Sequence, residues 1–115
     1  LQIEEAVALE LNPGRLCRDT WNLSEAEGGR LGYGEHLGGP KGRKAGFVGH
    51  GLGLEIDEYP VIGPLDQEIK ENMIIAVEPK MIYPGKGVVG VEDTYLIRSG
   101  GAESLTRLPR EIWRV

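Results

Sequence analysis

The chain has 115 residues, of which 40% are hydrophobic and 27% charged; this fits one soluble globular domain and excludes a disordered segment. The formal net charge of −5 argues against a nucleic-acid-binding protein, because such a surface needs a basic patch. No signal peptide and no apolar run of membrane-spanning length is visible, so we expect no membrane association. A lone Cys17 cannot form an internal disulfide, which favours a reduced thiol packed in a cytoplasmic protein.

The first third of the sequence predicts two helices. Residues 1–11 form the first, with glutamates away from one apolar stripe that contains Leu1, Ile3, Val7 and Leu11. An Asn-Pro-Gly sequence ends it, and a second helix is expected within residues 18–31, with Asp19 or Thr20 as its N-cap. Because the chain starts inside a predicted helix and without a methionine, we expect it to be a fragment.

Glycine is over-represented: it accounts for 18 of the 115 residues, roughly twice its usual share of about 7%. The glycines concentrate between Gly28 and Gly53, where they mark turns and places at which the backbone closely approaches something. Residues 32–46 form a glycine-rich loop, and its length indicates either a functional or mobile loop or an unrecognised element.

The second half predicts an antiparallel sheet. Residues 73–83 and 88–98, rich in Val, Ile and Tyr, flank a Pro-Gly-Lys-Gly turn and are typical of a β-hairpin. Pro79 lies inside the first run, so its missing N–H must fall at an edge or an irregularity. Residues 103–106 are a candidate third strand. Two helices followed by an antiparallel sheet favour the α+β class.

The hairpin brings two glutamates together. If its turn centres on Gly85, Glu78 and Glu92 are equally distant from the turn and stand directly opposite each other. Facing carboxylates repel and raise each other's pKa, and a cation between them removes that penalty. Alternatively both are surface residues paired with Lys80 or Arg98, and a register slip of one residue would separate them.

His50 lies in the sequence G-H-G-L-G-L. A lone histidine in a glycine-rich turn is usually a hydrogen-bonding loop residue. Its co-occurrence with Glu78 and Glu92 instead favours a metal site, and one imidazole with two carboxylates suits Mn, Fe, Co or Zn better than Ca.

Three motifs in order, G-H-G-L-G-L, A-V-E-P-K and G-V-E-D-T, resemble those of the creatinase/prolidase/aminopeptidase P family of pita-bread metallopeptidases. The resemblance covers about residues 1–109 and is strongest to the Xaa-Pro dipeptidases. It implies half of a pita-bread fold, with residues 1–115 forming the C-terminal portion of the catalytic domain and the N-terminal portion absent. The implied reaction is hydrolysis of peptides with proline at the second position.

The resemblance also assigns roles to the candidate residues. His50, Glu78 and Glu92 would be metal ligands, with Glu92 bridging two ions, usually Mn or Co and with Zn possible. Glu78 would accept the proton of the water that attacks the scissile carbonyl. The two aspartate ligands of the family precede this stretch, so we expect the chain alone to bind at most one ion, weakly, and to be inactive.

Two positions depart from the family pattern. Asp57 stands where prolidase-like enzymes usually carry a second catalytic histidine; it either attracts a cationic group of the substrate or caps the turn before Glu58. Gly90 stands where related peptidases often have an arginine, which removes a positive charge near Glu92.

Two other functions fit the resemblance. One is a non-catalytic pita-bread module that binds a peptide or partner in the same cleft; the other is a creatinase-like hydrolase that works without metal, against which Glu78 and Glu92 argue. We also expect homo-oligomers, because a half-domain exposes apolar surface.

Overall fold

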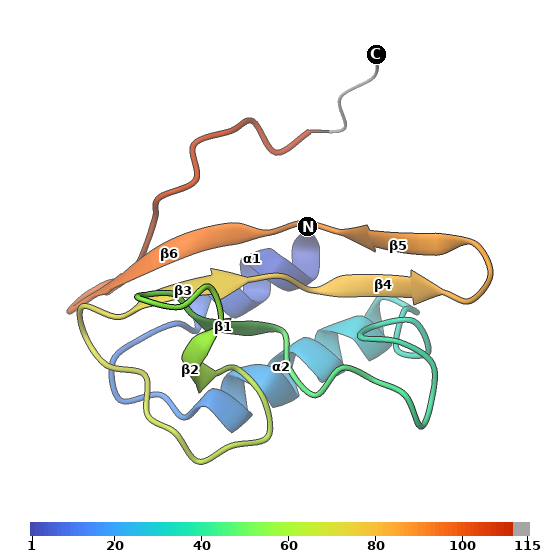
Figure 1. The fold of residues 1–115 in the computed structure, drawn as a ribbon, viewed down its shortest axis with the longest axis horizontal. Helices are drawn as coiled ribbons and strands as arrows, with labels where there is room; N and C mark the ends of the chain where they lie inside the picture. The colour runs from blue at the N-terminus through green and yellow to red at the C-terminus, as the bar shows by residue number, and fades with distance from the viewer. Residues whose placement is uncertain (112–115) are drawn as a thin grey trace.

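The computed structural model describes residues 1–111 and has an α+β architecture, as predicted (Figure 1). Its two helices precede the sheet strands in the chain. The elements are α1 (Gln2–Leu9), α2 (Cys17–Arg30), β1 (Gly49–Gly51), β2 (Glu58–Val61), β3 (Ile74–Val77), β4 (Lys80–Tyr83), β5 (Gly87–Gly90), β6 (Asp93–Arg98) and β7 (Gly101–Ser104).

The long hairpin has the predicted register. A five-stranded antiparallel sheet has the order β2-β1-β3-β6-β7, and β4 and β5 pair separately as the distal part of the same hairpin (Figure 1). Ile74 lies opposite Leu96 at one end, and Tyr83 lies opposite Gly87 at the other, so the turn is centred on Gly85.

The hairpin ladder is interrupted where the two glutamates lie. Two residues on each side of the hairpin lie outside its strands: Glu78 and Pro79 on one side, and the facing Val91 and Glu92 on the other. Pro79 has no N–H to donate to a ladder, so a break at this point is expected from its chemistry. The predicted irregularity is therefore present, and it separates β3–β6 from β4–β5.

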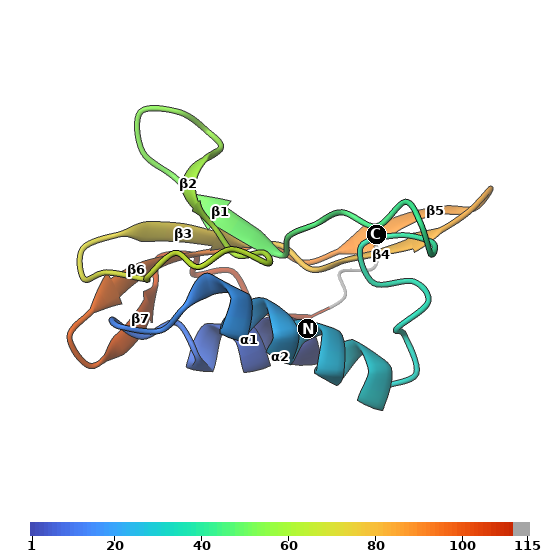
Figure 2. The same cartoon turned by 90° about the horizontal axis from the view of Figure 1, so that it is seen from below.

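Both helices cover one face of the sheet (Figure 2). Most strand residues that point toward them are apolar and fully or almost fully buried, with Asp93 as a charged exception, and they alternate with residues of the opposite face. Together with side chains of the helices and loops they form one core, which includes Ile3, Val7, Leu11, Cys17, Ile75, Val77, Tyr95 and Ile97.

Both helix predictions need correction at their ends. The first helix ends at Leu9 rather than at residue 11, and the second begins at Cys17 with no side-chain cap from Asp19 or Thr20. Instead, the free N–H groups of Cys17 and Arg18 donate hydrogen bonds to backbone carbonyls of the loop at residues 65–67. That cap is distant in the sequence, so no local pattern could have indicated it.

The sequence pattern placed Glu4 on the solvent-facing side of its helix, and this prediction is also wrong. Glu4 is fully buried and accepts a hydrogen bond from the Tyr95 hydroxyl, while Nη1 of Arg110 lies 2.9 Å from its Oε2. The tertiary partners that compensate its burial come from the other end of the chain.

Strands β1 and β2 were not predicted, because β1 is Gly-His-Gly and glycine is a poor strand former, while β2 contains Pro60, which cannot donate to a ladder. The structure explains the glycines: a Cβ on Gly49 would lie 2.5 Å from the carbonyl oxygen of Ala76, and one on Gly51 would lie 2.5 Å from that of Tyr59. The close approach that these glycines permit is thus to neighbouring strands. The candidate strand at residues 103–106 is in fact β7, which starts earlier, directly after a tight turn from β6.

The glycine-rich loop predicted at residues 32–46 consists of turns and bends, and its Leu37 makes an isolated bridge to Met81. Cys17 is a free, fully buried thiol, and its burial raises its pKa to about 11. Within residues 1–111, neither helix has the length and apolar character that crossing a bilayer requires.

Candidate metal centre and adjoining pocket

The sheet places the three candidate ligands on one face, the face opposite the helices. His50 on β1 lies directly opposite Ala76 on β3, and Ala76 lies directly opposite Thr94 on β6. Opposed residues of antiparallel strands share a face, and so do residues two apart on one strand. Glu78 follows Ala76 by two positions and Glu92 precedes Thr94 by two, so both glutamates share the face of His50.

Each of these three residues offers one ligand atom, and the three atoms lie within 4.8 Å of one another. Nε2 of His50 is 3.4 Å from Oε1 of Glu78. The side chains of His50 and Glu78 are 7% and 10% exposed, while Glu92 is exposed. The sequence-predicted facing of Glu78 and Glu92 is therefore found in the structure, with the histidine beside them.

The histidine is oriented in a way that suits a metal ligand. Its Nδ1 lies 2.9 Å from the carbonyl oxygen of Gly51, a contact that requires a proton on Nδ1. In the neutral imidazole, Nε2 then presents a bare lone pair to the carboxylates of Glu78 and Asp57. Acceptors that face one another repel, and a cation bound between them would remove this repulsion. A backbone carbonyl on the second ring nitrogen is also the usual support for a metal-binding histidine.

Lys80 supplies a positive charge at this face. Its ammonium group forms an ion pair with Oε2 of Glu78, and the pKa of Lys80 is raised, first by that hydrogen bond and also by the charges of Glu92 and Asp57. Gly90 is the residue directly opposite Lys80. Although position 90 carries no charged side chain, the facing strand thus places a positive charge at this face of the sheet.

Asp57 approaches His50 rather than capping its own turn. Its Oδ1 lies 2.9 Å from Nε2 of His50, and its side chain is 72% exposed. The turn is closed by Glu58, whose Oε2 accepts a hydrogen bond from the backbone N–H of Glu55. Asp57 thus contacts the ligand cluster through His50 while most of its side chain faces solvent.

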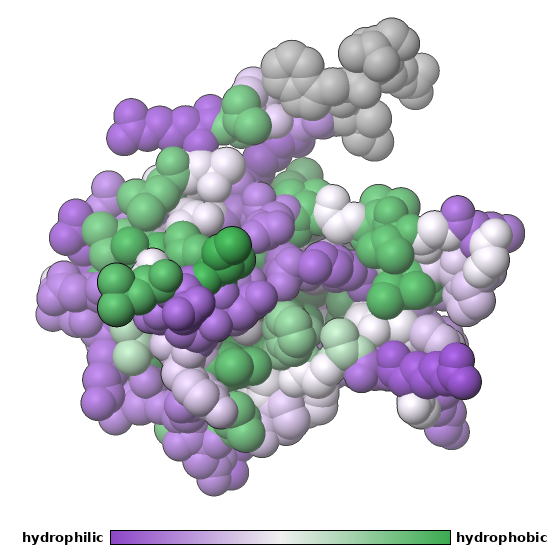
Figure 3. Space-filling view, viewed as in Figure 1, coloured by the Kyte–Doolittle hydropathy of each residue, from purple (hydrophilic) through white to green (hydrophobic). Residues whose placement is uncertain are grey.

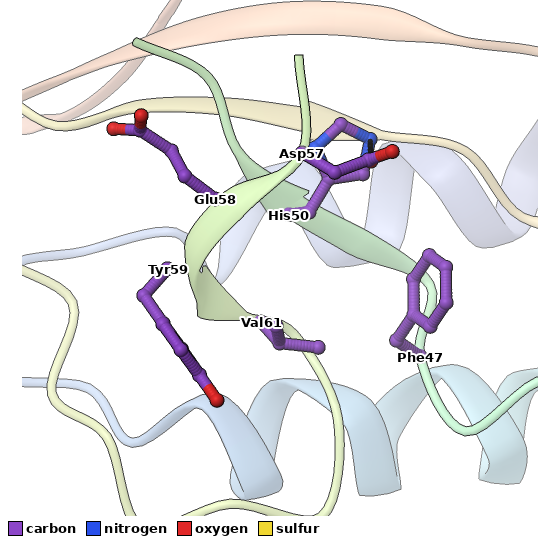
Figure 4. Close-up of a pocket in the computed structure, with 6 residues that line it drawn as sticks. All are labelled: Phe47, His50, Asp57, Glu58, Tyr59 and Val61. Carbon is purple, nitrogen blue, oxygen red and sulfur yellow. Dashed lines mark ion pairs between the residues drawn. The ribbon is translucent and has the colours of Figure 1, made fainter. Parts of the chain in front are cut away.

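A cavity of about 500 Å³ adjoins the cluster. His50 and Asp57 lie side by side at one part of its wall, and the carboxylate of Glu58 points away from them (Figure 4). The remaining wall is formed by Phe47, Tyr59 and Val61, and the Phe47 ring meets His50 edge-on with ring centroids 6.3 Å apart. Sequence reasoning missed these three residues; their only signal was that they flank the histidine motif.

A histidine and two glutamates thus converge on the open face of a helix-backed antiparallel sheet, beside a cavity, and this donor set suits a divalent metal ion. The chain belongs to metallopeptidase family M24, whose family model matches residues 1–99. The resemblance inferred from the three motifs is thereby confirmed.

Individual relatives agree with this assignment. The chain is 33% identical to the Xaa-Pro dipeptidase of Pyrococcus furiosus over 97% of this chain and 30% of that protein. Its fold matches an X-Pro aminopeptidase from Thermotoga maritima with a TM-score of 0.87, at 29% identity over 99% of this chain and 31% of the other. It also matches the prolidase from Pyrococcus horikoshii OT3 with a TM-score of 0.81, at 30% identity over 96% of this chain and 30% of the other.

These neighbours are pita-bread metallopeptidases, so the predicted partial pita-bread fold is confirmed. The chain spans about 30% of the length of the curated relatives it matches.

Proposed function

We propose that residues 1–115 form the C-terminal portion of the catalytic domain of a metal-dependent Xaa-Pro peptidase. The observation that carries this proposal is the convergence of one ring nitrogen of His50 with one carboxylate oxygen each of Glu78 and Glu92, within 4.8 Å. Family membership supports it, and so does the adjoining cavity, which is large enough for part of a peptide.

The donor set fits a divalent transition metal. One imidazole nitrogen and two carboxylate oxygens suit Mn or Co, with Zn possible, and we propose two ions in the complete enzyme. A divalent ion bound there would act as a Lewis acid that activates water and polarises the scissile carbonyl. His50 would be held in its ligating orientation by Gly51, and the carboxylate of Glu78 would accept the proton of the attacking water.

The proposed substrate is a peptide with proline at its second position. Phe47, Tyr59 and Val61 offer apolar surface of the kind that a proline ring can cover. Asp57 lies at the boundary between this surface and the ligand cluster, where its carboxylate can attract the protonated amino group of a peptide. This role accounts for an aspartate at a position where a neutral donor was expected.

Calorimetric titration with Mn²⁺ and with Zn²⁺ tests the metal site. Because the chain offers three ligands, we expect it to bind at most one ion, weakly, and to lack peptidase activity. Glu92→Gln should abolish that binding, whereas Glu103→Gln, which removes the same charge from an exposed residue on β7, should leave it unchanged. Tight binding of two ions by this chain, or equal binding by the Glu92→Gln variant, would refute the assignment.

The role of Asp57 is tested in a longer protein that contains this chain together with the remainder of the catalytic domain. Asp57→Asn should raise the KM for an unblocked Xaa-Pro substrate more than it lowers kcat, and acetylation of the substrate's amino group should remove the difference between the two enzymes. Asp57→His adds a second check, because it restores the residue usual in prolidase-like enzymes. An unchanged KM in the asparagine variant would leave Asp57 without a role in substrate binding.

A non-catalytic pita-bread module is the second candidate function. It is favoured by one observation, the occupation of the Glu78 carboxylate by the ammonium group of Lys80. The same titration discriminates, since a module that uses its cleft only to bind a peptide would bind neither Mn²⁺ nor Zn²⁺.

We also propose that the protein is cytoplasmic and forms homo-oligomers. Val88 and Val89 on β5 are 58% and 64% exposed, and hydrophobic side chains gather over this strand and over the loop between β1 and β2 (Figure 3). Exposed valines on an edge strand are a common basis for association. Light scattering should show an apparent mass that rises with concentration, and a constant monomer mass would exclude this.

A further inference from the structure

Lys80 and Gly90 form a matched pair across the distal part of the hairpin. They are direct partners in the β4–β5 ladder. A Cβ placed on Gly90 would lie 3.1 Å from Cγ of Lys80, which is closer than such atoms normally come. The stem of the lysine therefore passes close to the space that a Cβ at position 90 would occupy, and such a Cβ would require the stem to shift by a few tenths of an ångström.

This path delivers the ammonium group to the candidate metal site. It forms an ion pair with the Glu78 carboxylate, which is only 10% exposed, and it feels the negative charges of Glu92 and Asp57. The lysine thus brings a positive charge to a cluster that contains three carboxylates. Pro79 holds the backbone between Glu78 and Lys80, because its ring fixes one of the two backbone dihedrals.

The ion pair between Lys80 and Glu78 is also one that can be broken and re-formed. The Lys80 side chain is 49% exposed, and lysine carries its charge on a flexible four-carbon stem. A half-exposed ammonium group on such a stem can turn outward to water when another cation takes its place. An arginine fork held by two carboxylates would be much harder to displace.

We propose that Lys80 is a tethered cation that competes with a divalent metal ion for the Glu78 carboxylate, and that Gly90 is the residue that allows it to reach this position. The inference rests on the metal site proposed above and adds a device that sets its affinity. When metal is scarce, the ammonium group of the lysine partly neutralises the cluster and competes with weakly bound cations for the Glu78 carboxylate. Lys80 acts through Glu78, so it is a positioning residue and not a catalytic one.

The first experiment compares the affinity of the wild-type chain and of Lys80→Met for Mn²⁺ by calorimetry. Mn²⁺ has to break the ion pair between Lys80 and Glu78 and to displace a positive charge from the cluster, so removal of that charge should tighten Mn²⁺ binding about tenfold. Lys86→Met is the matched control: it removes the same charge from an exposed lysine in the turn of the same hairpin, and its Mn²⁺ affinity should equal that of the wild type.

The second experiment tests the role of Gly90 with a double-mutant cycle. Gly90→Ala should displace the lysine stem and tighten Mn²⁺ binding in the presence of Lys80. In a Lys80→Ala background, which has no Cγ to displace, the same substitution should have no effect. Circular dichroism of all variants checks that each is folded.

A third measurement reads the lysine without relying on affinity. Acylation of amines followed by mass spectrometry should label Lys80 slowly in the metal-free chain, and faster after Glu78→Gln or on addition of Mn²⁺, while labelling of Lys86 stays constant. Mn²⁺ binding that is equal in the wild type and Lys80→Met would overturn this inference and leave the metal site standing. Mn²⁺ binding by none of the variants would overturn both.

Discussion

Two acidic clusters lie on opposite faces of the same hairpin, at the point where the chain passes from Glu92 to Asp93. Neighbouring residues of an extended chain point to opposite faces, so Glu92 lies on the open face and Asp93 beneath the helices, 5% exposed. The first cluster is the candidate metal centre. The second, here called the Arg110 cluster, consists of Glu4, Asp93, Tyr95 and Arg110.

The Arg110 cluster contains its own permanent cation. Nη2 of Arg110 lies 2.7 Å from Oδ2 of Asp93, and Nη1 lies 2.9 Å from Oε2 of Glu4. The Tyr95 hydroxyl donates a further hydrogen bond to Glu4. A guanidinium cannot lose its proton at ordinary pH, and its planar fork matches two carboxylates. This cluster ties the C-terminal segment to α1 and β6.

The metal centre is built in the opposite way. Its counterion is a half-exposed lysine, one of its carboxylates is exposed, and a histidine lone pair faces the others. A buried acidic cluster with a fixed counterion stabilises a fold, whereas one with a replaceable counterion is suited to bind and release a cation. The same residue types are thus held by a fixed cation on one face and by an exchangeable one at the candidate metal centre on the other.

The largest effect is expected from breaking the Arg110 cluster. Arg110→Met leaves Glu4 and Asp93 buried without their cation, and removal of one partner from a buried ion pair typically costs about 3–5 kcal/mol in the free energy of unfolding. Because the Arg110 side chain is 31% exposed, we expect a loss at the lower end, about 3 kcal/mol. Urea denaturation followed by circular dichroism measures it.

Arg107→Met is the control for that experiment, because it removes the same charge from an exposed residue of the same segment. Its free energy of unfolding should stay within about 0.5 kcal/mol of the wild type. Equal losses in the two variants would mean that the cluster contributes nothing specific.

The metal centre should respond in the reverse manner to Glu92→Gln. The residue is exposed, so the metal-free free energy of unfolding should change by no more than about 0.5 kcal/mol. At a Mn²⁺ concentration of a hundred times the Kd, the wild type should gain about 2.7 kcal/mol, and the variant should lose this gain. Thermal unfolding with and without Mn²⁺ provides the measurement; a metal-free loss as large as that of Arg110→Met would erase the distinction between the clusters.

A smaller effect is expected in the pH dependence of stability. Burial is the main reason why the pKa of Glu4 is raised, although its contacts with Tyr95 and Arg110 lower it. A raised pKa in the folded state means that the folded chain holds more protons than the unfolded chain between the two pKa values. The free energy of unfolding therefore falls as pH rises through that window, from about the ordinary glutamate value upward.

Glu4→Gln mimics the protonated acid and should flatten this part of the pH profile, while Glu35→Gln, on the exposed loop, should leave the slope unchanged. Denaturation midpoints between about pH 4 and pH 7 measure the slope. An unaltered slope in the Glu4→Gln variant would assign the pH dependence to other groups.

The two clusters were not equally predictable from the sequence. The apolar alternation through Ile75 and Val77 and the turn around Gly85 specify the hairpin register, and with it the facing of Glu78 and Glu92. Because these are local signals of period two, they could be recognised in a single sequence. His50 was recognised by its motif, although its strand was not.

The Arg110 cluster could not be predicted, because its members interact over long distances in the sequence. Glu4 and Arg110 are separated by 106 positions, and on the helix pattern alone Glu4 belongs to the solvent. The pairing of Lys80 with Glu78 was foreseen only as an alternative to a metal site. The position of the lysine stem depends on Gly90, which lies opposite Lys80 in the β4–β5 ladder, and a glycine in a single sequence does not reveal which residue it faces.

Cys17 provides a separate probe of the helix side of the sheet, because it packs fully buried among the core residues there. Its pKa is raised by burial from 9.0 to about 11, so near neutral pH a folded chain should react with a thiol reagent at least about a hundredfold more slowly than an unfolded one. Labelling then reports how often the helices separate from the sheet. Arg110→Met, which loosens α1 from β6, should accelerate it, whereas Glu92→Gln should not. Equal acceleration by both would mean that the open face also holds the helices in place, and that the division of labour between the two faces is wrong.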